Sequence, residues 1–351
     1  MGIPVKLLLI GALILLAGPA ASLAGSSKSS QPPTASNYHA PPGDKPVEVR
    51  VGLYMLNLVA LDEVHQTFTC TGYLTEKWKD PRLSFIPRED SPQKRYYRKD
   101  DVWFPPLQFD NSAALRTETS YVLDVTSDGA AEYVVKFAVT LSINMALRAF
   151  PFDSQDLAVY IHPFAGDVDR IVLAIDPDST GVSPAPYTPL PLWSTGSMSY
   201  RLMNERFSAG YKVRTHAIFA MHVKRDSEYY IYKIFLPLVL MVAISWGALW
   251  IPPADLNSQL VTSVTTVLTL VAFSVAISNV LPPVPYMTFC DMFFLICFVF
   301  VLVSVGEVLI VHTWHNRGRA EIARRIRRAT RLLLPPAFVL VIVTFGYLFL
   351  R

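Results

Sequence analysis

The chain has 351 residues, of which 52% are hydrophobic and only 17% are charged. Soluble globular domains carry about 25% charged residues, so part of this chain is expected to lie in lipid. The net charge of +3 gives no support to nucleic-acid binding, and no nucleophile, phosphate-loop or metal-ligand motif is present, so we expect neither catalysis nor a cofactor.

Residues 1–24 predict a secretory signal that ends at Ala24. Lys6 precedes an apolar stretch of roughly a dozen residues, whereas a bilayer-spanning helix needs about 20. A short N-terminal anchor is the alternative. Residues 25–46 are polar, rich in proline and without periodicity, which predicts a flexible leader.

Residues 47–228 are dominated by alternating apolar and polar side chains. The clearest example runs from Val213 to Val223 and predicts a half-buried antiparallel strand. Similar runs occur at 49–61, 67–78, 119–126, 131–144, 156–162 and 170–175. Ser127-Asp128-Gly129 is a predicted hairpin turn. Many short strands without a convincing helix predict a β-sandwich.

Residues 229–351 predict a transmembrane domain of four helices, each long enough to cross a bilayer. Its apolar segments lie at 231–251, 256–281, 287–310 and 332–350. The stretch 312–331 holds seven arginines against one acid, which predicts a cytoplasmic loop by the positive-inside rule. Four crossings then place the sandwich and the C-terminus outside. A solvated amphipathic helix at the inner membrane surface would account for the arginines.

The second apolar segment carries more hydroxyl side chains than the other three. On a helix, one narrow stripe contains Ser258, Thr262, Thr265 and Thr269. This stripe would suit a water-filled path or, equally, a tight seam between helices, because Ser and Thr commonly pack between membrane helices.

Several motifs occur in the same order as in pentameric ligand-gated ion channels, which the chain resembles. They are Trp78-Lys79-Asp80, Trp103-Phe104-Pro105, Phe150-Pro151-Phe152-Asp153-Ser154-Gln155, Pro237, Thr265-Thr266-Val267-Leu268-Thr269 and Leu281-Pro282. Ile143 and Leu157 stand where animal members carry the two cysteines of their signature loop, so the chain is similar to the proton-gated and amine-gated prokaryotic members. The resemblance implies a homopentamer around a central pore, held in the lipids of a bacterial inner membrane with its sandwich in the periplasm. It also implies that a small molecule or the proton is the agonist.

In such a pentamer, five copies of the second apolar segment would line the pore. By resemblance the lining residues are Val261, Thr265, Leu268, Ala272, Val275 and Asn279. Leu268 is expected to form the central gate, because a narrow apolar ring blocks ions by dewetting. Five Asp255 carboxylates at the inner mouth would favour monovalent cations, or Asp255 could serve only as a helix N-cap.

The family places three charges where the sandwich meets the helices, and the resemblance assigns them to Glu63, Asp153 and Arg225. One guanidinium can bridge two carboxylates. Pro282 is expected to stiffen the loop after the pore segment, so that sandwich motion reaches the gate. Glu307 lies within an apolar segment and is expected to face a partner or water.

Relatives bind agonists in an aromatic box at the subunit interface. The candidates by resemblance are His162, Phe164, Tyr200, Phe207, Tyr211 and, from the neighbouring subunit, Tyr73. Aromatic faces suit a cationic amine or an aromatic compound, although each residue could instead be a packing residue. For protons, Gln66 replaces the sensing Glu of the proton-gated relative and cannot titrate, whereas His65 and His162 can. A membrane-anchored binding module without conductance is the alternative function.

Overall fold

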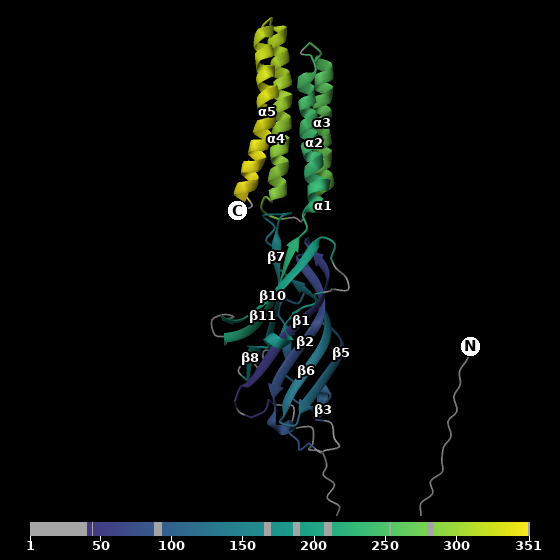
Figure 1. Cartoon of the computed structure of the whole chain (residues 1–351), viewed down its shortest axis with the longest axis vertical. Coiled ribbons are helices and arrows are strands. Elements are labelled where there is room, and N and C mark those ends of the chain that lie inside the picture. Colours follow the sequence, from purple (N-terminus) through teal and green to yellow (C-terminus); the bar gives the residue numbers. More distant parts are fainter. Residues whose placement is uncertain are drawn as a thin grey trace, which may run out of the picture.

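The structure, a computed structural model, describes residues 41–43, 45–87, 93–164, 170–184, 190–206, 213–252, 254–278 and 284–349. The signal and most of the leader predicted from the sequence lie outside these ranges, as do Phe207, Tyr211, Asn279 and Pro282. The described residues form a β-sandwich and, at one end of it, a bundle of long helices (Figure 1). The predicted fold class is therefore confirmed.

The sandwich consists of two sheets, and the larger one has the strand order β3-β5-β6-β2-β1-β8, with β9 beside β1. Its strands are β1 (Val47–Asp62), β2 (Thr67–Lys79), β3 (Lys94–Tyr96), β5 (Thr117–Thr126), β6 (Ala130–Ser142), β8 (Ile171–Ile175) and β9 (Gly181–Val182). The smaller sheet has the order β10-β11-β7-β4. It contains β4 (Leu107–Phe109), β7 (Ser154–Pro163), β10 (Trp193–Arg206) and β11 (Val213–Arg225).

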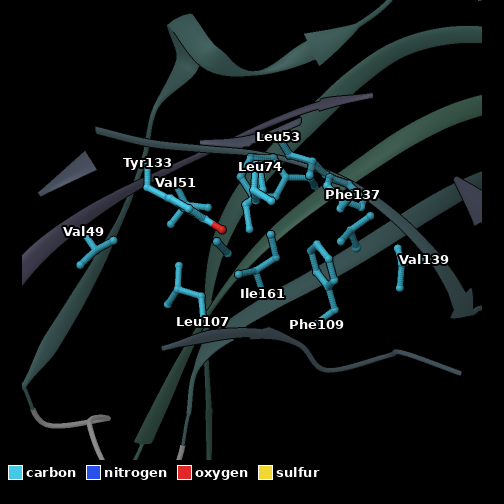
Figure 2. Packing of buried hydrophobic residues seen from close by; sticks show 14 of the residues in the cluster. Val49, Val51, Leu53, Leu74, Leu107, Phe109, Tyr133, Phe137, Val139 and Ile161 are labelled. Carbon is cyan, nitrogen blue, oxygen red and sulfur yellow. The ribbon is translucent and has the colours of Figure 1, made fainter. Parts of the chain in front are cut away.

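The core lies between the two sheets, because alternate residues of each strand turn inward. Figure 2 shows part of it, in which Leu53, Leu74 and Phe137 are completely buried. Each such side chain contributes about 1.5–3 kcal/mol through the removal of apolar surface from water. The predicted turn at Ser127-Asp128-Gly129 joins β5 to β6, and Gly129 has a φ of 82°. A Cβ on Gly129 would also lie 2.5 Å from the carbonyl oxygen of Asp80, so glycine is required there.

Four helical spans follow the sandwich. The first contains α1 (Glu228–Tyr230), the π-helical η5 (Ile231–Phe235), α2 (Leu236–Gly247) and the 3-10 helix η6 (Ala248–Trp250). Pro237 lacks the N–H that would continue regular α-helical bonding, which explains the π-turn just before it. The other spans are α3 (Leu256–Ser278), α4 (Phe289–Asn316) and α5 (Ala320–Phe349).

The connection between α4 and α5 differs from the predicted loop at 312–331. Residues 317–319 alone separate the two helices, and the arginine-rich stretch forms the first turns of α5. Glu321 supports this helical start by pairing with Arg324 at 2.9 Å across one turn. The apolar residues alone predict a fourth helix from residue 332, whereas the helix begins at Ala320. At its far end, α5 reaches the sandwich side of the bundle, where Phe345 stacks on Phe289 of α4 (Figure 1).

Candidate functional site

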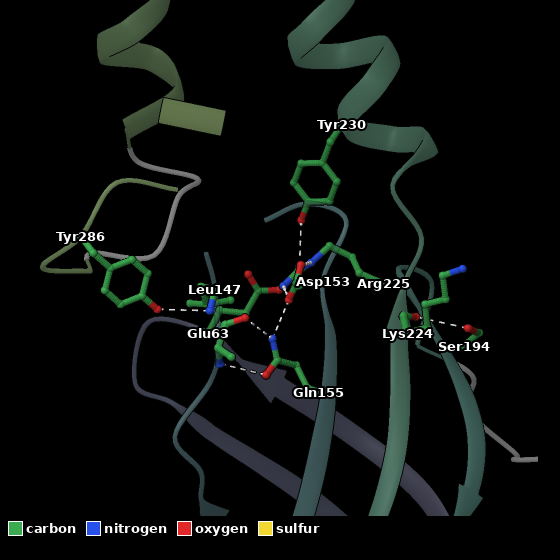
Figure 3. A network of polar contacts seen from close by, with 10 residues as sticks. Glu63, Leu147, Asp153, Gln155, Ser194, Lys224, Arg225, Tyr230 and Tyr286 are labelled. Carbon is green, nitrogen blue, oxygen red and sulfur yellow. Dashed lines mark hydrogen bonds and ion pairs between the residues drawn. The ribbon is translucent and has the colours of Figure 1, made fainter. Parts of the chain in front are cut away.

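Arg225 ends β11, and its buried guanidinium occupies the junction between the sandwich and the helices (Figure 3). Its Nε donates to Oδ1 of Asp153 at 2.7 Å and its Nη2 to Oδ2 of the same carboxylate at 3.2 Å. Its Nη1 donates to Glu63, in the turn after β1, and to the hydroxyl of Tyr230 in α1 at 3.2 Å. The structure thus brings together the three charges that the resemblance singles out.

Aromatic rings and carboxylates together keep the Arg225 guanidinium charged. Its Cζ lies 4.2 Å from the ring centroid of Trp193 and 4.5 Å from that of Phe150. Burial acts to lower the pKa of Arg225, but the hydrogen bonds that it donates to Asp153 and Glu63 outweigh burial and raise this pKa above its usual value. Removing one partner of such a buried pair leaves an uncompensated charge and costs about 3–5 kcal/mol.

The loop between β6 and β7 is clamped from both sides (Figure 3). From the sandwich, Gln155 donates to Asp153 at 2.7 Å and to the carbonyl of Ala146 at 3.1 Å, and it accepts from the Ala146 N–H at 3.1 Å. From the segment just before α4, the hydroxyl of Tyr286 accepts from the N–H of Leu147 at 3.1 Å. A shift of this loop therefore acts on the start of the third span.

Phe152 and Phe289 extend the same contact through apolar packing. The ring of Phe152 stacks on Phe235, with 6.0 Å between the ring centroids, and meets Phe289 edge-on, with 5.3 Å between the centroids. The N–H of Phe289 donates to the carbonyl of Arg148 at 2.8 Å. The loop thus contacts the first span through Phe235 and the third through Phe289.

The candidate pore residues share one face of α3. Those that the structure describes are exposed in the single subunit: Val261, Thr265, Leu268, Ala272 and Val275. The opposite face packs inside the bundle through Gln259, Ser263, Thr266, Leu270 and Ile277. Hydroxyl groups of this helix bond to its own backbone, as when Thr262 donates to the carbonyl of Ser258 at 2.9 Å. The helix therefore carries its hydroxyls without needing a polar neighbour for each of them.

Asp255 precedes α3 and is exposed. Its Oδ1 accepts from the N–H of Ser258 at 3.1 Å, so it caps the helix. Hydrogen bonds from the hydroxyl and the N–H of Ser258 lower the pKa of Asp255, which keeps this carboxylate ionised at neutral pH. Capping and a charged ring at the pore mouth are compatible roles for one exposed carboxylate.

Arg327 lies inside the bundle at the end distant from the sandwich. It is buried, although the arginine-rich stretch predicts solvated side chains, because the helical path of α5 turns this residue inward. Its Nη2 donates to Gln259 at 3.1 Å, its Nη1 donates to the carbonyl of Ile251, and its Nε lies 3.5 Å from Glu307. One guanidinium on α5 thus contacts α3, α4 and Ile251, the residue that follows the first span, and Glu307 faces a charged partner.

Phe164 is the most exposed of the described aromatic candidates for agonist binding, at 55%. Its N–H donates to the carbonyl of Pro106 at 2.7 Å, which ties it to the segment before β4. Tyr200 is exposed on β10, in the smaller sheet that also contains β4, whereas Tyr73 is exposed on β2 of the larger sheet. Within one subunit, Tyr73 and Phe164 therefore belong to different sheets of the sandwich.

His162 is only 1% exposed and does not offer its ring to a surface ligand. Its Nε2 lies 3.1 Å from both Gln108 and Asp110, and its Nδ1 lies 2.8 Å from the carbonyl of Pro163. His216 of β11 lies behind it, with 5.2 Å between the ring centroids. His162 thus lies buried near the end of β7, two residues before the exposed Phe164.

Two family models match successive parts of the chain. The neurotransmitter-gated ion-channel ligand binding domain matches residues 35–227, and the neurotransmitter-gated ion-channel transmembrane region matches residues 234–340. The chain belongs to the neurotransmitter-gated ion-channel family. This ligand-gated channel is therefore a multi-pass membrane protein with an extracellular N-terminal domain, and it comes from a family of pentameric channels and not of enzymes.

Curated relatives of this channel include a prokaryotic and several animal proteins. A proton-gated ion channel of Gloeobacter violaceus is 28% identical over 309 residues, which cover 88% of this chain and 85% of the relative. A gamma-aminobutyric acid receptor subunit beta of Lymnaea stagnalis is 28% identical over 304 residues, covering 82% of this chain and 60% of the subunit. A gamma-aminobutyric acid receptor subunit beta-like protein of Drosophila melanogaster is 27% identical over 300 residues, covering 80% of this chain and 60% of that protein. The resemblance stated from the motifs is confirmed.

Proposed function

We propose that this channel is a homopentamer of a bacterial inner membrane that opens on a small-molecule agonist or a pH change and conducts monovalent cations. The exposed face of α3 carries the proposal. Leu268 is 67% exposed in the single subunit, and a heterologous ring of five subunits would gather five copies of it around one axis. A narrow ring of leucines would stop ions by dewetting, and it would conduct when the helices move apart.

The charged junction supports gating from the sandwich. Arg225 is bonded at once to Asp153, Glu63 and Tyr230, so the sandwich and the first span share one buried polar group. Coupling between two sites requires an element whose states both sites can bias. A rearrangement of this group is the step that we assign to opening, with the agonist near Phe164 as the remote trigger.

The decisive experiment replaces Leu268 with serine and measures current through vesicles that contain the purified channel. A hydroxyl ring is wetted more easily, so Leu268→Ser should open at lower stimulus or leak at rest. Leu340→Ser is the matched control, because Leu340 on α5 is also 67% exposed. Silence of the wild type and of Leu268→Ser, with folded assemblies, would replace the channel by a membrane-anchored binding module.

Cation selectivity is assigned to Asp255. Asp255→Asn keeps an N-capping side chain but removes the charge from the mouth of the pore. The reversal potential under a salt gradient should therefore move away from the cation equilibrium potential, with the helix intact. Glu321→Gln, which removes an exposed acid at the start of α5, should leave the reversal potential unchanged. A wild-type reversal potential at the anion value would overturn the assignment.

A further inference from the structure

An acidic residue, Glu76, lies inside the sandwich among apolar side chains. It is 1% exposed, and neither of its carboxyl oxygens has a hydrogen-bond partner among the described residues. In the sheet register it stands between Val51 of β1 and Tyr133 of β6, and both of these residues belong to the core shown in Figure 2. An ionised carboxylate without partners in such a place is strongly unfavourable, whereas a protonated one is tolerated.

The charged groups that face Glu76 come from other elements and are bonded to a different acid. Lys99 of the short helix η3 (Lys99–Asp101) donates to Glu118 at 2.6 Å, and Arg116, which precedes β5, donates to it through Nη2 at 2.6 Å. The hydroxyl of Tyr133 also donates to Glu118, at 3.4 Å. The second terminal nitrogen of Arg116, Nη1, is buried and has no hydrogen-bond partner in the described part of the chain.

We propose that Glu76 is a proton-binding site within the sandwich, and that loss of its proton draws Arg116 from Glu118 toward Glu76. In the protonated state, the neutral carboxylic acid leaves both cations with Glu118. On deprotonation, the proton goes to solvent and the carboxylate accepts N–H bonds from the free Nη1 of Arg116. The guanidinium remains charged throughout, so one cation is exchanged between two acids.

The electrostatics of the cluster agree with this exchange. Burial raises the pKa of Glu76 to about 8, against the opposing effect of Arg116 and Lys99. Burial acts on Glu118 in the same direction, but its bonds from Lys99 and Arg116 bring the pKa of Glu118 below its usual value. Glu118 therefore stays ionised while Glu76 changes state in mildly alkaline solution.

The exchange acts on the segment that holds Phe164. The guanidinium of Arg116 lies 5.1 Å from the ring centroid of Phe109, the last residue of β4. The carbonyl of Pro106, immediately before β4, binds the backbone N–H of Phe164. A displaced Arg116 thus alters the support of the candidate agonist site. This consequence rests on the proposed channel function, whereas the proton site itself does not.

Infrared spectroscopy of the full-length channel in phosphatidylcholine vesicles tests the proton site without any current. Between about pH 6 and about pH 10, the wild type should lose the carbonyl band of a buried carboxylic acid. Glu76→Gln, an isosteric change, should lack this titrating band, and Glu132→Gln, which alters a neighbouring acid that pairs with Lys77, should keep it. Absence of the band in the wild type, or its persistence in Glu76→Gln, overturns the proposal.

The role of Arg116 is tested by Arg116→Gln in the same titration. Without the guanidinium, ionised Glu76 cannot recruit the cation that precedes β5, so the midpoint of the band should move to higher pH. An unchanged midpoint would overturn the exchange. The pH dependence of the current then tests the link to gating, because in Glu76→Gln the current should change less with pH above neutrality than in the wild type. If the band titrates and both channels follow one pH–current curve, the link is wrong, whereas silence of every variant counts against the proposed function alone.

Discussion

At the scale of single residues, the junction depends on the shape of the Arg225 side chain as much as on its charge. A guanidinium presents several N–H groups in a plane and can satisfy Asp153, Glu63 and Tyr230 together. An ammonium is a point charge that cannot reproduce this fork. The junction is therefore built for arginine.

Arg225→Lys should accordingly reduce the evoked current by about tenfold or more, which corresponds to about 1.4 kcal/mol of lost coupling. The assembly should remain intact in size-exclusion chromatography, since the charge is retained. Arg201→Lys, at an exposed position of β10, is the control and should conduct normally. Normal current from Arg225→Lys would remove the junction from the gating path.

The charged members of the junction could be predicted from the sequence, but their neutral partners could not. Glu63, Asp153 and Arg225 stand at positions that the family resemblance marks. Tyr230 and Tyr286 bond to this region through hydroxyl groups, and tyrosine at these places is as consistent with packing as with bonding. A neutral hydrogen bond across the fold leaves no periodic signal in the chain.

At the scale of elements, Arg327 on α5 stabilises the inner end of the bundle. Arg327→Gln leaves the Glu307 carboxylate buried without its cation and should cost about 3–5 kcal/mol of stability. The double variant Glu307→Gln/Arg327→Gln should lose less than the single one, because no charge remains unpaired. Thermal unfolding in detergent measures both, with Arg328→Gln, at an exposed neighbouring position, as the control. Equal stability of Arg327→Gln and the wild type would contradict this role.

The long elements followed from periodicity, and the short ones did not. Strands such as β2 and β6 span enough residues for alternation to emerge, whereas β3 and β4 have three residues each. The first turns of α5 lie outside the apolar segment that predicts the fourth crossing, because arginines interrupt the hydrophobic run, and only the alternative of an amphipathic helix anticipates them. Helical pairing with Glu321 and the inward position of Arg327 become visible only in three dimensions.

At the scale of the whole molecule, Glu76 gives folding stability a pH dependence of known sign. Its pKa is raised by burial from 4.5 to about 8, so between these values the folded chain binds a proton that the unfolded chain has released. This contribution to stability is fully present below pH 4.5 and is lost as the pH rises to about 8. Thermal unfolding followed across this window should show a decline in the wild type and a flatter profile in Glu76→Gln. Parallel profiles would show that Glu76 does not titrate there.

The chain passes from the sandwich to the helices between Arg225 and Glu228, and among the described residues Arg225 and the β6–β7 loop donate or accept hydrogen bonds across this boundary. A sandwich from another protein thus needs to supply an arginine at the place of Arg225, two carboxylates at the places of Glu63 and Asp153, and one matching loop. The sandwich and the helical domain could in this sense be exchanged between related proteins. A chimera that joins another sandwich to these helices at Asp226 would respond to the ligand of that sandwich, so this chain is a starting point for engineered biosensors.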